Sequence, residues 1–101
     1  MWNIGQWVTL LTDNSTYSIK GLETAQGKYL AIHMQAMSFT SGANIGTLPS
    51  NWQPKVIARF LFVSGTSYGF CNMEANGNIR LYATEGNQAS TDYILKISQD
   101  L

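Results

Sequence analysis

The sequence has few charged side chains. They make up 12% of its 101 residues, about half of the share usual in globular proteins, and the six basic and six acidic residues cancel. Such a chain has no basic stripe for the phosphates of nucleic acid or for an anionic membrane. We therefore expect neither a nucleic-acid partner nor membrane insertion. A surface of Ser, Thr, Asn, Gln and Gly suits neutral partners such as carbohydrate, but it equally suits a protein that binds nothing.

Cysteine is nearly absent as well. Cys71 stands alone, which excludes an internal disulfide and a cysteine metal cluster, and we expect a small buried hydrophobe there. With one histidine, His33, and scattered carboxylates, we predict no metal site and no cofactor. No apolar run reaches the roughly 18 residues of a membrane span, and the first residues lack the features of a signal peptide. We expect the protein to be made in a cytoplasm without an export signal of its own.

The two prolines are confined to one window, "IGTLPSNWQP" at residues 45–54, which also holds Trp52. Because proline cannot donate to a central sheet ladder, this window predicts a rigid connection between two strands. A connection with preset φ angles costs less entropy to order than a flexible one. We expect Trp52 to rest against the end of the fold.

Alternating apolar and polar residues dominate the rest of the chain, and no segment keeps a helical period. Strands are predicted at 6–11, 16–23, 28–39, 55–64, 67–74, 78–84 and 91–98. Turn residues separate them, and Asn76-Gly77 is the strongest hairpin signal. The sequence therefore predicts a single all-β domain over residues 1–101, a compact antiparallel barrel or sandwich of about seven strands.

Two of these segments, 28–39 and 55–64, predict which side chains lie together on each face of the sheet. In 28–39 the alternation separates two faces. One face carries Leu30, Ile32, Met34 and Ala36, and the other carries Tyr29, Ala31, His33, Gln35 and Met37. Segment 55–64 is apolar on both faces except at Arg59. A small barrel cannot bury both faces of every strand. Either a loop covers the surplus, or Ile57, Leu61, Val63 and Met37 line a threefold contact between identical chains.

Two motifs support a family resemblance. "TLPSNWQP" keeps Thr47, Leu48, Pro49 and Pro54 of a "TLP-x-G-Y-R-P" turn, and "NMEANGNIRLY" keeps Asn76, Gly77, Ile79, Arg80, Leu81 and Tyr82 of an "N-G-x-V-x-I-Y" hairpin. Over residues 45–98 the order of segments resembles the C-terminal domain of tail-fibre and baseplate proteins from phages of Gram-positive bacteria. Within that group the chain is similar to the head domains of lactococcal-type receptor-binding proteins.

The resemblance implies a compact antiparallel β-barrel, assembled as a homotrimer, that adheres to bacterial cell-wall saccharide. It also implies a place in the virion, at the phage tail tip or baseplate, with other tail or baseplate proteins as neighbours. The chain would then be a single receptor-binding head domain.

The best candidate site is the predicted hairpin at 67–84. It places Tyr68, Phe70, Asn72 and Glu74 on one face, and Arg80 and Tyr82 share that face across the turn. Aromatic rings offer a platform to a sugar, and planar polar groups bind its hydroxyl edge. The predicted saccharide-binding residues are Tyr68, Phe70, Asn72, Arg80, Tyr82, Trp52 and His33. The alternatives are an Arg80–Glu74 surface pair beside ordinary strand aromatics, and a His33 that is merely exposed or at an interface.

Three functions compete. We expect a non-catalytic receptor-binding domain with no catalytic residues. The first alternative is a structural trimerising cap or baseplate docking domain. The second is a tail-associated glycan hydrolase, which needs two carboxyl groups about 5 to 9.5 Å apart. The chain has six carboxylates: Asp13, Glu23, Glu74, Glu85, Asp92 and Asp100. Most of them fall at turns or strand ends, and only Glu74 neighbours the aromatic hairpin at 67–84.

Overall fold

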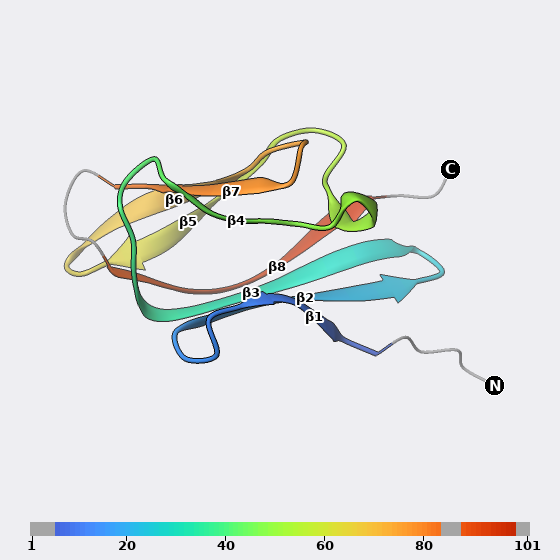
Figure 1. Cartoon of the computed structure of the whole chain (residues 1–101), viewed down its shortest axis with the longest axis horizontal. Helices are drawn as coiled ribbons and strands as arrows, with labels where there is room; N and C mark the ends of the chain where they lie inside the picture. Colours follow the sequence, from blue (N-terminus) through green and yellow to red (C-terminus); the bar gives the residue numbers. More distant parts are fainter. Residues whose placement is uncertain (1–5, 84–87, 99–101) are drawn as a thin grey trace.

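The computed structural model describes residues 6–83 and 88–98, and within them the chain is almost entirely antiparallel β-structure (Figure 1). The strands are β1 (Val8–Thr12), β2 (Tyr17–Thr24), β3 (Gly27–Ser38), β4 (Asn44–Thr47), β5 (Ala58–Ser64), β6 (Ser67–Met73), β7 (Asn78–Tyr82) and β8 (Gln88–Ser98). A short 3₁₀ helix, η1 (Ser50–Trp52), follows β4. None of the described residues lies in a helix with the length and apolar content that a bilayer crossing requires.

All the strands belong to one sheet, in the order β1-β2-β3-β8-β5-β6-β7-β4. Figure 1 shows β1, β2 and β3 in one half and β4 to β7 in the other, with β8 running between them. The two edge strands approach each other, because the Leu11 side chain of β1 lies against Gly46 of β4, where an added Cβ would be 3.1 Å from Leu11 Cδ1. The result is a nearly closed barrel-like sheet, so the predicted all-β fold class is confirmed.

The described residues form eight strands rather than the predicted seven or so. The additional strand, β4, opens the proline window, where Asn44 pairs with Arg80 and Thr47 with Asn78 of β7. The interpretation of the whole window as a connection is therefore wrong at its start. Both prolines lie outside the strands, and Pro49 directly precedes η1, as a residue without a backbone donor requires.

The core lies between the two halves of the sheet. Its buried side chains come from both halves: Ile19, Leu30, Ile32 and Met34 from one, and Phe60, Phe62, Cys71, Met73, Ile79 and Leu81 from the other. Cys71 is the small buried hydrophobe that was predicted, and its burial raises the pKa of the thiol to about 12. The core is filled by alternate residues of each strand, as a pleated sheet with one face covered dictates.

Strand β3 departs from its predicted alternation near its end. Leu30, Ile32 and Met34 are buried as expected, but the pairing with β8 shifts register between Met34 and Met37. Ala36 sits in this bulge with φ of 49° and is exposed, whereas Met37 is only 5% exposed. The predicted placement of Ala36 on the face of Met34, with Met37 on the opposite face, is wrong, because an extra residue in a bulge swaps the faces beyond it. Met37 is buried and is therefore not part of a threefold contact surface.

Trp52 packs against one end of the barrel, as predicted. Its ring occupies the space above Gly21 of β2, where an added Cβ would approach the ring to 2.7 Å. Lys28 also lies over the ring, with Nζ 5.1 Å from the ring centroid, and donates a hydrogen bond of 2.5 Å to the carbonyl of Asn51. The side chain is consequently 8% exposed and belongs to the core.

Candidate functional site

The β6–β7 hairpin is set by its Asn-Gly turn. Gly77 has φ of +92°, which only glycine adopts without strain, and the Asn78 N–H donates to Asn76 Oδ1 at 3.0 Å. The amide of Gly77 also donates to the Glu74 carbonyl at 2.8 Å. This turn fixes a register in which Phe70 faces Tyr82 and Asn72 faces Arg80, so the predicted shared face is confirmed.

An aromatic platform lies on that face. The rings of Phe70 and Tyr82 stack with their centroids 5.0 Å apart and their planes 20° from parallel. Tyr68, the next outward residue on β6, is 68% exposed. Together with three small side chains these rings line a hollow of about 490 Å³, which we call the aromatic hollow: Ser41, Ser67, Tyr68, Phe70, Tyr82 and Ala83.

Arg59 of β5 adds a cation to the edge of this platform. Its guanidinium carbon lies 4.8 Å from the centroid of Phe70, and its Nε donates to Asn72 Oδ1 at 2.7 Å. Asn72 is 9% exposed, so its role is to hold Arg59 rather than to meet a ligand. The sequence analysis did not name Arg59 as a site residue. The available signal was that it is the one charged residue in the apolar run 56–64.

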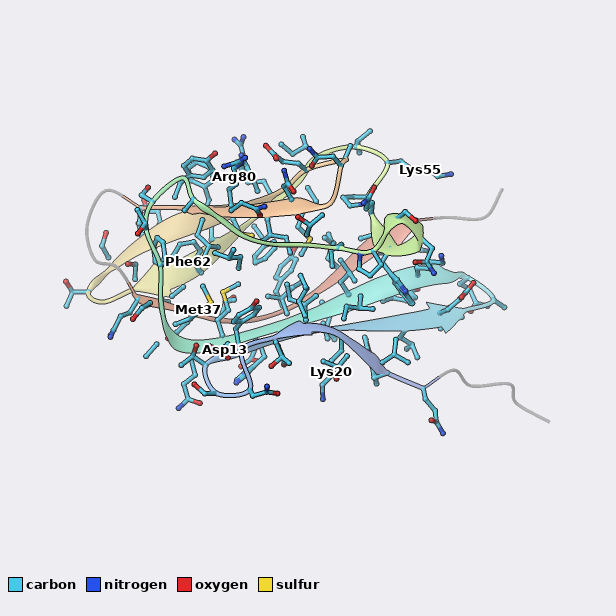
Figure 2. The ribbon with its side chains drawn as sticks, viewed as in Figure 1. Asp13, Lys20, Met37, Lys55, Phe62 and Arg80 are labelled. Atoms are coloured by element: carbon cyan, nitrogen blue, oxygen red, sulfur yellow. The ribbon has the colours of Figure 1, made fainter. Side chains whose placement is uncertain are left out.

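Arg80 holds a loop in place beside the hollow. Its Nε is 3.4 Å from Glu74 Oε1, and its Nη1 donates to the Gly42 carbonyl at 2.9 Å. Figure 2 shows Arg80 on the outer side of its half of the sheet. The loop that Arg80 holds carries Ser41, whose Oγ accepts a hydrogen bond of 3.2 Å from the Ala83 N–H. The Arg80–Glu74 pair foreseen as the alternative is therefore present, and Arg80 supports the rim of the hollow.

Two predicted site residues lie elsewhere. Trp52 is buried under Lys28, so the prediction that its ring serves surface recognition is wrong. His33 lies on β3, in the other half of the sheet, where its Nδ1 is 2.5 Å from Asp92 Oδ1. The order of strands along the chain could not reveal the contact between His33 and Asp92. Strands β3 and β8 are far apart in sequence and become neighbours only when the sheet forms.

Hydrolysis or metal binding at the aromatic hollow would depend on the carboxylates and possible metal ligands near it. Within residues 6–83 and 88–98, no group of three or more His, Cys, Asp or Glu side chains is placed to hold a metal ion. Glu74 is the carboxylate next to the predicted site, and it is engaged by Arg80. Glu85 and Asp100, considered above for hydrolysis, lie outside the described residues.

Comparison with known proteins adds no relative. No protein-family model matches the sequence, and no curated protein matches it.

Proposed function

We propose that this domain is the receptor-binding head of a phage tail or baseplate protein, and that it adheres to host cell-surface saccharide without cleaving it. The observation that supports this most is the aromatic hollow, where stacked Phe70 and Tyr82 and exposed Tyr68 form a platform. The apolar C–H face of a sugar ring packs on such a platform, while phenolic and serine hydroxyls bond its edge.

Arg59 suits this role because it is already held in place. A guanidinium that stacks on Phe70 and donates to Asn72 has little rotamer freedom left to lose when a ligand binds. Ser41 and Ser67 supply hydroxyls to the lining of the proposed site, and Arg59 lies next to it, stacked on Phe70.

The residues favour binding over catalysis. Glycoside hydrolysis needs a pair of carboxyl groups across the bound sugar, and Glu74 already pairs with Arg80. Ser18, His33 and Asp92 do lie in one row across β2, β3 and β8. Yet no hydrogen bond joins Ser18 to His33 in the described structure, and β3 has a bonded strand on each side, so its N–H groups serve the ladder rather than an oxyanion.

We further propose that the head is a homotrimer that associates through an apolar stripe on β5. Leu61 and Val63 face outward and are 64% and 55% exposed, and Ile57, just before the strand, is 53% exposed. Leu61 is paired with Phe70 and Val63 with Tyr68, so the stripe borders the aromatic hollow. Association through the β5 stripe would place each saccharide site beside a neighbouring protomer.

The test of saccharide binding is a calorimetric titration of the full chain with purified cell-wall polysaccharide fragments from a panel of Gram-positive bacteria. We expect saturable binding without release of reducing ends, and we expect Tyr82→Ala to weaken it about tenfold or more, since a buried aromatic anchor dominates such interfaces. Tyr29→Ala is the matched control, because Tyr29 is a half-buried tyrosine on β3, outside the hollow.

Each other outcome assigns a different function. Release of reducing ends would favour the glycan hydrolase, and no binding to any fragment would favour the structural cap or docking domain. An equal loss of affinity in Tyr82→Ala and Tyr29→Ala would contradict the aromatic hollow as the site.

A further inference from the structure

A second hollow, of about 510 Å³, lies on the outer face of β2, β3 and β8. It is lined by Ser18, Lys20, Ala31, Ile32, His33, Asp92, Tyr93 and Ile94. In Figure 2, Lys20 and Arg80 lie on opposite sides of the molecule. This second hollow therefore faces away from the aromatic hollow, and the proposed function does not use it.

The strand register arranges its side chains in two rows. Ser18, His33 and Asp92 are directly paired across the three strands and form a polar row. The adjacent outward row is Lys20, Ala31 and Ile94, apolar apart from the lysine. Neighbouring side chains on one face of a sheet lie about 4.5 to 8 Å apart, so one bound sugar residue can contact members of both rows.

The polar row is fixed and accessible. His33 Nδ1 and Asp92 Oδ1 are 2.5 Å apart, and their side chains are 52% and 82% exposed. This contact engages one oxygen of the Asp92 carboxylate and leaves the other to accept hydrogen bonds. A carboxylate that faces solvent beside an imidazole suits adjacent hydroxyl groups, which donate to it.

The charges and the apolar row narrow the ligand class. The positive charge of Lys20 offsets the negative charge of Asp92 within the hollow, which favours a neutral ligand over an ionic one. Ile94 is 65% exposed and lies beside Ala31, so the pair offers a small apolar surface. A ligand with a C–H face on one side and hydroxyls on its edge matches both rows.

We propose that this second hollow is a further saccharide site, which takes one neutral sugar residue through hydroxyls bonded to Asp92 and to Lys20. The inference rests on the proposed function and extends it. A head with sugar sites on two opposite faces engages two stretches of glycan at once, and the second contact then forms at a raised effective concentration.

The test is an NMR titration of the full chain, labelled with ¹³C and ¹⁵N, with galactose, glucose and N-acetylglucosamine and then with the polysaccharide fragments that bind in calorimetry. We expect the His33 ring and Ile94 methyl signals to shift with at least one neutral sugar. Asp92→Asn or Lys20→Gln should raise the dissociation constant obtained from those shifts about tenfold. The shifts at Phe70 and Tyr82 should stay as in the wild type. Tyr82→Ala should weaken binding at the aromatic hollow and leave the shifts at His33 and Ile94 as in the wild type.

Glu23→Gln is the matched control, because it neutralises an exposed carboxylate on β2 that does not line the hollow. Shifts confined to the aromatic hollow would overturn the second site and leave the proposed function standing. Shifts at neither hollow would overturn both. If Asp92→Asn changes the molar mass in solution and no sugar moves His33, the hollow is a contact between copies, and the proposal fails.

Discussion

Gly69 sets how closely β7 approaches β6 beneath the aromatic hollow. A Cβ at this position would lie 2.2 Å from the Tyr82 carbonyl oxygen and 2.7 Å from Phe62 Cζ. Since one obstacle is backbone, the strands themselves must move to admit a methyl group. We expect Gly69→Ala to lower the free energy of unfolding by about 1 to 3 kcal/mol and to disturb the Phe70–Tyr82 stack. Urea denaturation and the ring signals in NMR measure the two effects.

Gly46→Ala is the control for that substitution. Its Cβ would meet Leu11 Cδ1 at 3.1 Å, the end of a flexible side chain that can turn away. We expect a loss below about 1 kcal/mol there. Equal stability of Gly69→Ala and the wild type would show that the two strands are less closely apposed than the structure has them.

Asp13 organises the turn between β1 and β2. Its Oδ2 accepts the Thr16 hydroxyl, and its Oδ1 accepts the backbone N–H groups of Ser15 at 2.9 Å, Thr16 at 2.7 Å and Tyr17 at 2.9 Å. These bonds, that of the Thr16 side chain first, hold the pKa of the carboxyl well below its usual range. The ionised form is therefore favoured by folding.

The pH dependence of stability follows from that direction. A carboxyl whose pKa is lower in the folded chain contributes stability above its unfolded pKa of about 4, and this is lost as the pH falls further toward the folded value. We expect the wild type to lose stability below about pH 4 more steeply than Asp13→Asn, so that the two converge in acid. Thermal melts between pH 6 and 2 test this. Parallel pH profiles would contradict it.

Individual side chains also mark the limits of prediction from the sequence. The outward set Phe70, Arg80 and Tyr82 was predictable, because Asn76-Gly77 fixes the register on both sides of it. The burial of Trp52 was not, since it depends on the space left by Gly21, 31 residues away in sequence (52 − 21).

At the scale of elements, the bulge in β3 carries an avoidable strain. Ala36 has φ of 49°, a left-handed conformation that costs an L-residue about 1 kcal/mol more than glycine. We expect Ala36→Gly to stabilise the protein and to raise Tm by up to about 4 to 8 °C. Differential scanning calorimetry measures the shift.

Ala75→Gly is the comparison for the bulge. Ala75 is exposed in the β6–β7 turn and is not among the residues with positive φ, so glycine there only adds freedom to the unfolded chain. Its Tm should fall. A fall of the same size in Ala36→Gly would argue against the left-handed bulge.

The strands that were predicted correctly and the one that was missed differ in physical character. Leu30, Ile32 and Met34 follow strict alternation, and their burial was predicted. The bulge after Met34 was not, because it depends on pairing with β8 rather than on local composition. Strand β4 was not predicted because it is only four residues long, contains Gly46, and is defined by its pairing with β7.

At the scale of the whole molecule, the outer surfaces of the two halves differ. The outer face of β5 and β6 combines Leu61, Val63 and Tyr68, all more than half exposed. The outer face of β2, β3 and β8 carries the Lys20 and Asp92 charges. Because exposed apolar side chains that cluster on one face mark contact surfaces, the β5 face is where self-association is expected.

The proposed homotrimer gives the last prediction. Light scattering of the full chain should give three times the chain mass of 11.2 kDa, and Leu61→Ser should shift the mass toward 11.2 kDa, because it removes apolar area at the middle of the β5 stripe. Ile94→Ser is a closely matched control, since Ile94 is 65% exposed against 64% for Leu61 but lies on β8, in the second hollow. A wild type that scatters as one chain at every concentration would overturn the trimer. It would leave the saccharide site intact, because the residues that line the aromatic hollow all come from one protomer.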